Sequence, residues 1–373
     1  MAEGASERRA TWTELLFDLV FVVIVAELAH RLKHDLDGAR VGAFAFLFLP
    51  AWWAWIGSTF YANRFDRDDL TGRLFVLLEM LAAAALAVSV HDALDTTSRA
   101  FAIAYVAARV ILIALYLLAA RRVPGSRALA HRYAAGFALA AAQWLASVWV
   151  APPWRFALWG AGMLIDLVTP LTARRIQATL PLDTAHLPER FGLFTLIVMG
   201  ESVVGAVQGV AGRSWDLPAA LAGMLGMVLV FSVWWSYFEN MVGTAIRRTL
   251  LAGQVWVYGH LPLVMSLAAL GAGLQRAVSA DPAAALPAAD RWLIAGALAS
   301  ALASMAVIDL ATRGEASAVP SGRRAAIRLV GAAAAALIGL LAAGLPPPAL
   351  IGCLAAVGAG LVAADLLLRA RPR

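Results

Sequence analysis

Long apolar runs alternate with short polar segments along the whole chain. Each run approaches the roughly 20 residues that a helix needs to cross the hydrocarbon core of a bilayer. Turn-forming residues separate neighbouring runs, as at Pro152-Pro153 and at Pro346-Pro347-Pro348. The pattern predicts an all-α polytopic membrane protein with twelve transmembrane helices, at residues 12–32, 41–63, 72–92, 99–119, 130–150, 155–173, 189–211, 216–238, 253–275, 291–312, 325–345 and 348–368.

The composition agrees with this pattern. Of the 373 residues, 62% are apolar and 14% are charged, whereas soluble domains carry roughly 25% charged residues. The one cysteine, Cys353, lies in an apolar run, which excludes a disulfide framework and a cysteine metal cluster. We expect no cleavable signal peptide, because the first apolar run follows Arg8 and Arg9 and itself contains acidic residues.

The basic residues lie mostly in the loops between the apolar runs. With the N-terminus in the cytoplasm, 21 of the 30 lysines and arginines fall on the cytoplasmic side and eight on the other, while Arg109 lies within a run. This bias follows the positive-inside rule and predicts that both termini are cytoplasmic. The net charge of +6 therefore reflects membrane topology, and we expect no nucleic-acid partner.

The two halves of the chain share a weak repeat. The segment from Glu14 to Glu27 is similar to the segment from Glu189 to Glu201, since each has an acid at its start and another near mid-membrane. This similarity predicts two six-helix repeats in parallel orientation, at residues 1–180 and 181–373. Duplicated membrane folds place their sites near the repeat interface. Chance similarity between helices rich in alanine and leucine is the alternative.

Two segments carry a family resemblance. Residues 13–22 (TELLFDLVFV) resemble the opening of the bacterial low temperature requirement protein A (LtrA) family, and residues 186–195 (HLPERFGLFT), with GESVV at 200–204, resemble its second signature. The layout of many helices is similar along essentially the whole chain. The resemblance implies a multi-pass protein of the bacterial inner membrane, but it implies no settled activity.

A fainter likeness supports a cation channel as an alternative function. The segment Phe17-Asp18-Leu19-Val20-Phe21 is similar to the Phe-Ser-Asp helix of a lysosomal-type potassium channel family, which is also built of six-helix repeats. The seventh run, at 189–211, has no matching Phe-Asp pair.

Charged residues inside the first run are candidates for a polar site. An ionised side chain at mid-bilayer costs at least about 2.5–3.5 kcal/mol, so such residues usually face a bundle interior or a water-filled cavity. Glu14 and Asp18 are four residues apart and share one helix face. Glu27 lies about half a revolution away from Asp18 and can share a proton with His30. Interfacial charges exposed to solvent are the alternative for Glu14, Glu27 and His30.

The seventh run combines acids with a base. Arg190 and Glu201 are eleven residues apart and therefore lie on one stripe of the helix. Arg109 needs an acidic partner at mid-depth, for which either Glu201 or Asp166 is suitable. These residues form either a structural ion pair or a site at which an acid changes protonation. Gly192, Gly200 and Gly205 are expected to let a neighbouring helix approach closely.

Glu79 and His260 fall at matching positions in the two predicted repeats. The unperturbed pKa of histidine, near 6.5, makes His260 a candidate proton carrier, although a buried structural histidine is the alternative. Asp309, Asp365 and Glu239 lie near cytoplasmic helix ends and are expected to be solvated.

These patterns favour a secondary transporter or permease of unknown substrate, with proton coupling suggested by the buried acids. The alternatives are a cation channel and a membrane-embedded enzyme or scaffold needed for growth in the cold. No zinc-type spacing, phosphate loop or nucleophile elbow is present, so we expect no enzyme activity, cofactor or metal. The expected partners are the lipid bilayer and a small solute or ion, and a homodimer stays open. The polar-site residues are Glu14, Asp18, Glu27, His30, Glu79, Arg109, Asp166, Glu189, Arg190, Glu201 and His260.

Overall fold

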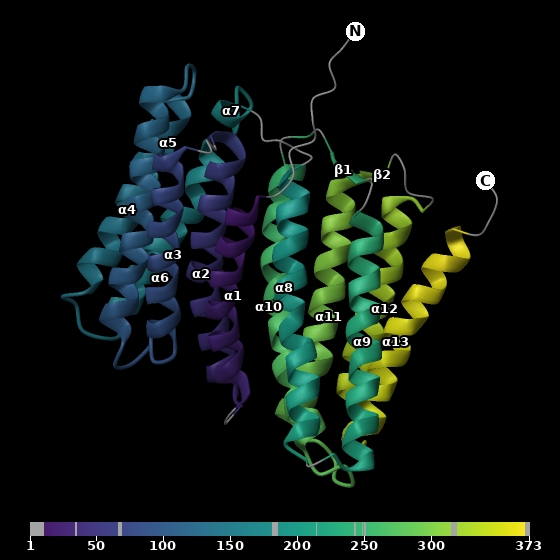
Figure 1. Ribbon diagram of the computed structural model, residues 1–373. Coiled ribbons are helices and arrows are strands. Elements are labelled where there is room, and N and C mark those ends of the chain that lie inside the picture. The colour runs from purple at the N-terminus through teal and green to yellow at the C-terminus, as the bar shows by residue number, and fades with distance from the viewer. Residues whose placement is uncertain are drawn as a thin grey trace. The chain divides into compact units, whose positions relative to one another are not determined.

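The computed structural model describes residues 11–33, 36–65, 69–180, 186–213, 215–241, 244–247, 249, 251–314 and 319–369. This part of the chain is almost entirely helical (Figure 1). Its elements, in chain order, are α1 (Trp12–His30), the 3-10 helix η1 (Arg31–Lys33), α2 (Gly38–Phe65), α3 (Leu70–Val90), α4 (Ser98–Arg122), α5 (Arg127–Ser147), α6 (Trp154–Thr172), α7 (Arg174–Gln177), α8 (His186–Ala211), α9 (Leu217–Met241), β1 (Thr244–Ile246), α10 (Ala252–Ser279), α11 (Ala288–Ala311), β2 (Thr312–Gly314), α12 (Ser321–Leu341) and α13 (Pro347–Arg369).

Each predicted span coincides with one long helix, and the boundaries differ by a few residues. Within the described residues, nine helices are long and apolar enough to cross a membrane, namely α2, α3, α4, α8, α9, α10, α11, α12 and α13. The multi-pass character is therefore supported, while the count of twelve spans stays a prediction. Helix α1 contains three carboxylates, at Glu14, Asp18 and Glu27, which lower its hydropathy.

The chain divides into two compact units. One comprises residues 1–28 and 45–193, and the other comprises residues 29–44 and 194–373. The boundaries between the units fall inside α1, α2 and α8. The predicted repeats at 1–180 and 181–373 concern duplication of the sequence, and they stay a prediction.

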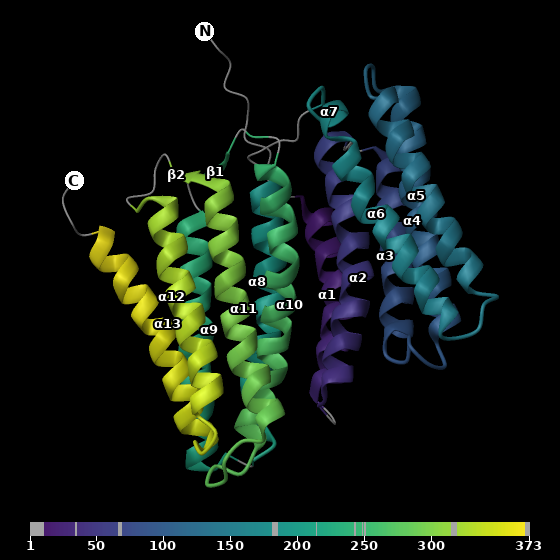
Figure 2. The ribbon, with the colours of Figure 1, turned by 180° about the vertical axis from the view of Figure 1, so that it is seen from behind.

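In the first unit, α3, α4, α5 and α6 pack in chain order. Figures 1 and 2 show these helices from the front and from behind. Aromatic rings fill part of the space between them. Trp144 and Trp159 stack with their ring centroids 4.8 Å apart, and Tyr133 stacks on Phe137 at 5.5 Å. The Trp144–Trp159 stack joins α5 to α6 and adds to the burial of apolar area, whereas Tyr133 and Phe137 both lie on α5.

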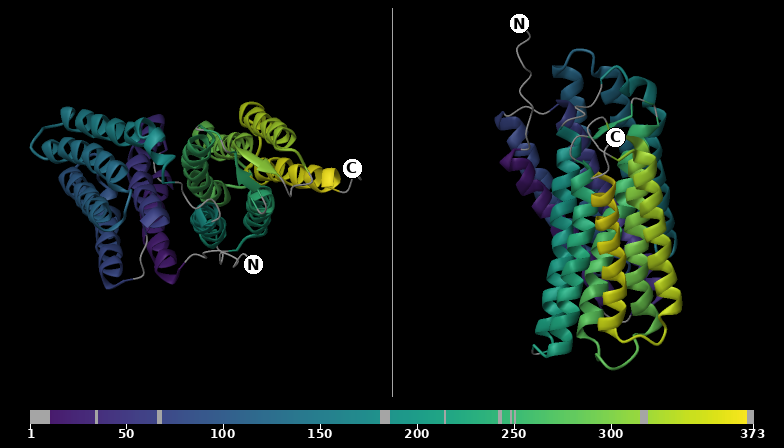
Figure 3. Two further views of the ribbon diagram at one scale, coloured as in Figure 1. Left: turned by 90° about the horizontal axis from the view of Figure 1, so that it is seen from above. Right: turned by 90° about the vertical axis from the view of Figure 1, so that its right-hand side faces the viewer.

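In the second unit, α10, α11, α12 and α13 also pack in chain order, and α13 contacts α9 (Figure 3). Strands β1 and β2 form a two-stranded antiparallel ladder that links the segment after α9 to the end of α11. Helices α8 and α10 come into close contact at Gly205 and Gly271, where a Cβ on Gly205 would overlap the carbonyl oxygen of Gly271. The predicted close approach at Gly205 is confirmed, whereas a Cβ on Gly200 would meet no atom within 4 Å and the prediction for that glycine is wrong.

Gly205→Ala is therefore expected to lower the stability of the second unit by about 1–3 kcal/mol, because the added methyl group would push two backbones apart. Gly200→Ala is the matched control. It adds the same methyl group to the same helix in open space and improves helix propensity by up to about 1 kcal/mol. The melting temperatures of the purified variants in detergent measure the difference, and equal melting temperatures would contradict the close approach.

Candidate functional site

An ionic cluster in the first unit joins the start of α1 to the start of α8. The guanidinium of Arg190 lies 2.8 Å from Oε1 of Glu14 and 2.7 Å from Oδ1 of Asp18. All three side chains are buried. Helix periodicity explains the geometry on α1, because residues four apart project from the same face and can both reach one guanidinium.

Two further side chains hold this cluster in place. The indole Nε1 of Trp55 donates a hydrogen bond of 2.7 Å to Oδ1 of Asp18, and Phe191 packs edge-on against the Trp55 ring. His186 lies between two acids, with Nε2 3.2 Å from Oε1 of Glu14 and Nδ1 3.7 Å from Oε2 of Glu189. Arg190 is therefore the cationic partner of both buried acids, Glu14 and Asp18, and the His186 ring lies beside Glu14.

A second buried group in the first unit contains Arg109. Its Nε lies 3.3 Å from Oδ2 of Asp166, and its Nη2 donates to the Tyr105 hydroxyl at 2.7 Å. That hydroxyl donates in turn to Oδ2 of Asp166 at 2.6 Å. Arg109 also lies over the faces of the Tyr105 and Phe137 rings, at 4.8 and 5.3 Å from their centroids. Arg109 thus pairs with Asp166, one of the two acids that the sequence offered.

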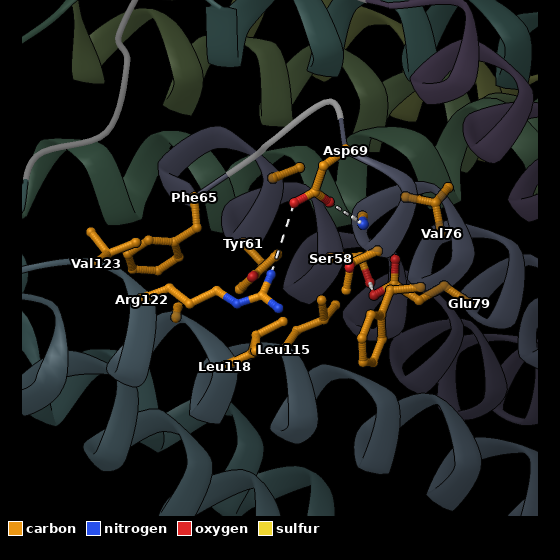
Figure 4. Close-up of a pocket in the computed structure, with 15 residues that line it drawn as sticks. Ser58, Tyr61, Phe65, Asp69, Val76, Glu79, Leu115, Leu118, Arg122 and Val123 are labelled. Carbon is orange, nitrogen blue, oxygen red and sulfur yellow. Dashed lines mark hydrogen bonds and ion pairs between the residues drawn. The ribbon is translucent and has the colours of Figure 1, made fainter.

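Glu79 has different surroundings, although it too lies in the first unit. Its side chain is buried, and its Oε1 accepts a hydrogen bond of 2.6 Å from the Ser58 hydroxyl. The residue lines a cavity of about 60 Å³ between α2, α3 and α4 (Figure 4). Of the basic side chains that the structure describes, none forms an ion pair with Glu79.

In the second unit, His260 lies fully buried within a hydrogen-bonded chain. Its Nδ1 is 2.7 Å from the carbonyl oxygen of Trp256, which can only accept, so Nδ1 carries a hydrogen. Nε2 then accepts from the Tyr237 hydroxyl at 2.9 Å, and Thr195 donates to that hydroxyl at 3.4 Å. The chain therefore fixes one tautomer of a neutral histidine.

The prediction that Asp309 is solvated is wrong. Its carboxylate is buried, 3.2 Å from Nε of Arg324 and 2.5 Å from Nη1 of Arg328. The two arginines lie one turn apart on α12 and face the end of α11. Glu239 is exposed, as expected, and pairs with Arg369.

Three predicted residues remain to be described, namely Glu27, His30 and Glu201. Glu27 is 44% exposed, with Oε2 4.0 Å from Nδ1 of His91. His30 is exposed, and Glu201, in the second unit, is half-buried. Seven of the eleven predicted residues therefore form separate polar groups in the first unit, around Arg190, Arg109 and Glu79. Sequence reasoning missed Trp55, Tyr105 and His186, whose roles depend on contacts between helices far apart in the chain.

Comparison with known proteins places the chain in a family. The model of the bacterial low temperature requirement A protein family matches residues 9–363, nearly the whole chain. The chain belongs to this family. An uncharacterized protein of Rhizobium meliloti (strain 1021) is 27% identical over 284 residues, which cover 70% of this chain and 68% of that protein.

In this member of the low temperature requirement A family, the two segments that carry the resemblance meet in space. Glu14 and Asp18 belong to the first segment, and His186, Glu189 and Arg190 belong to the second. Their ion pairs tie the first helix to the helix that begins the second half of the chain. The cluster therefore has a clear structural role, which is to hold these two helix starts together.

Proposed function

We propose that this protein is a secondary transporter of a small solute that couples transport to protons through Glu79. The surroundings of Glu79 carry the proposal. It is a buried carboxyl that lines a cavity, and within the described chain no arginine, lysine or histidine pairs with it.

The contrast with the other buried acids supports this assignment. Glu14 and Asp18 share Arg190, and Asp166 has Arg109. A carboxylate held by a buried guanidinium keeps its charge, because protonating it would leave the arginine uncompensated in a low dielectric. Glu79 has a hydroxyl as its partner, so both its protonated and its ionised form can be accommodated.

A parallel between the two units supports the proposed duplication. In the first unit a hydroxyl on α2, from Ser58, contacts the titratable Glu79 on α3. In the second unit a hydroxyl on α9, from Tyr237, contacts the titratable His260 on α10. These are the second and third spans of each proposed repeat. The duplication is consistent with a transporter built of two six-helix repeats in the same orientation.

The location of the protein forms part of the proposal. The bias of basic residues toward alternate loops supports a bacterial inner-membrane protein with both termini in the cytoplasm. A cation channel receives less support, because the Phe-Asp likeness rests on Asp18, whose Oδ1 is already bound by Arg190 and Trp55.

Glu79→Gln is expected to abolish solute flux driven by a pH gradient, because an amide cannot exchange a proton yet keeps the size of the side chain. The test uses purified protein in liposomes that contain a pH-sensitive dye, with a panel of small solutes added outside. Glu239→Gln is the matched control, since it makes the same change at an exposed site and should leave the flux unchanged. Wild-type flux in the Glu79→Gln variant would overturn the proposal.

A further inference from the structure

The cavity around Glu79 combines one deep acid with apolar and aromatic walls. Tyr61 and Phe65 of α2 and Phe75 of α3 line it, together with aliphatic side chains such as Leu115 of α4. Figure 4 shows Glu79 and Ser58 at one end and Asp69 with Arg122 at the other. Most of the lining is apolar, so a ligand would make few polar contacts besides those to these four residues.

The charged groups at the two ends of the cavity differ in whether an opposite charge neutralises them. Asp69 and Arg122 are 44% and 42% exposed, and their side chains lie 3.8 Å apart as an ion pair that neutralises both. Asp69 also caps α3 by accepting from the backbone N–H of Gly72 at 2.7 Å. Glu79, which is 7% exposed, is therefore the cavity-lining charge that no counter-charge neutralises among the residues described.

We propose that this cavity binds a small organic cation, a primary amine of a few carbon atoms, whose ammonium group pairs with the Glu79 carboxylate. The proposal rests on the function proposed above and names its class of substrate. An ammonium would supply the counter-charge that Glu79 lacks, and the faces of the aromatic rings attract cations as well. The apolar walls fit alkyl carbons.

Size and ligand chemistry favour an amine over a metal ion. A volume of about 60 Å³ has room for only a few water-sized groups, which suits an amine with three or four heavy atoms. Calcium takes six to eight oxygen ligands, and magnesium six. The described residues hold no group of three or more His, Cys, Asp or Glu side chains that could bind a metal.

Proton and amine would compete for the same carboxylate. Binding takes the form Glu79–COOH plus R–NH3⁺ giving Glu79–COO⁻ paired with R–NH3⁺, and one proton is released. The other charges near Glu79 are the Asp69–Arg122 pair and, at longer range, Arg109 and Arg190. A carrier that alternates access to such a site exchanges protons for amine, which would make the protein an antiporter.

Propylammonium and 1-propanol provide the test, because they have the same number of heavy atoms and differ in charge. Saturation-transfer NMR on the purified wild-type protein in detergent measures their binding at pH 8 and pH 5. We expect propylammonium to bind and 1-propanol not to bind. We also expect propylammonium binding to weaken at pH 5, where the amine is still protonated but protons compete for Glu79. Equal binding of the two compounds would overturn the proposal.

A variant test adds specificity. Glu79→Gln should lose propylammonium binding, whereas Glu239→Gln should keep it, and binding that persists in Glu79→Gln would overturn the proposal. If Glu79→Gln fails to fold, the comparison of propylammonium with 1-propanol on the wild-type protein still tests the amine site.

Binding in detergent without proton-linked flux in liposomes would contradict the proposed transport but not the amine site. Flux that depends on Glu79 without amine binding would contradict the amine site alone.

Discussion

Arg190→Met is expected to destabilise the first compact unit by about 3–5 kcal/mol, because it strands two acids in a buried site. Glu14 and Asp18 both lose their guanidinium partner, and Asp18 is fully buried. Methionine keeps most of the apolar stem of the arginine, so the lost stability measures the removal of the charge rather than the removal of packing contacts. Thermal unfolding in detergent and the yield of monodisperse protein measure the effect.

A surface ion pair supplies the control for this prediction. Arg213 pairs with Asp216 at 2.6 Å, but the two side chains are 28% and 34% exposed. Exposed pairs contribute about 0–1 kcal/mol, so Arg213→Met should shift the melting temperature little. Adding Asp18→Asn to Arg190→Met should recover part of the lost stability, because it removes one stranded charge. Equal stability of the two single variants would contradict the buried cluster.

The positions of the helices could be predicted from the sequence because a bilayer imposes a simple rule. A run of about 20 apolar residues must satisfy its backbone hydrogen bonds internally, and a helix does so within one segment. The predicted span at 72–92 becomes α3 at Leu70–Val90, and the span at 155–173 becomes α6 at Trp154–Thr172. The close packing at Gly205 follows from the same local chemistry, since only a glycine lets two backbones meet there.

The partner of Arg190 could not be predicted in this way. Glu14 and Asp18 lie more than 170 residues before it, and helix periodicity gives the face of a residue but not the helix that it faces. Because Arg190 and Glu201 lie on one stripe of α8, the sequence pointed to Glu201 rather than to the acids of α1. A usable signal was present all the same, because the two segments that carried the family resemblance are the ones that meet.

The burial of Asp309 shows a second limit of sequence reasoning. A carboxylate at a helix end is usually solvated, and the position of Asp309 in the chain gave no reason to expect its burial. The hairpin to α12 brings Arg324 and Arg328 against it, and Arg328 also donates to the carbonyl oxygens of Met305 and Ser236. Glu79 shows a related limit, since the sequence made it a candidate but the cavity beside it depends on packing between three helices.

Arg109→Met is expected to cost about 3–5 kcal/mol as well, since Asp166 would be left buried with the Tyr105 hydroxyl as its partner. Tyr105→Phe keeps both charges and removes one hydroxyl, so its cost should be smaller, at about 1–3 kcal/mol. Thermal unfolding of the two variants in detergent shows which one loses more stability. A larger loss for Tyr105→Phe would contradict a greater contribution of the ion pair than of the hydroxyl.

The double variant Arg109→Met with Asp166→Leu separates the two roles that the sequence left open for this pair. Apolar residues of similar volume often replace a buried ion pair without loss of stability, so the double variant should unfold near the wild-type temperature. If its flux in liposomes also equals that of the wild type, the pair is a structural lock and the proton site lies elsewhere. If stability returns and flux does not, Asp166 or Arg109 takes part in the transport cycle, and Glu79 is then not the sole residue on which coupling depends. The described contacts favour the first result, because Asp166 is bound by Arg109 and Tyr105 whereas Glu79 lines a cavity.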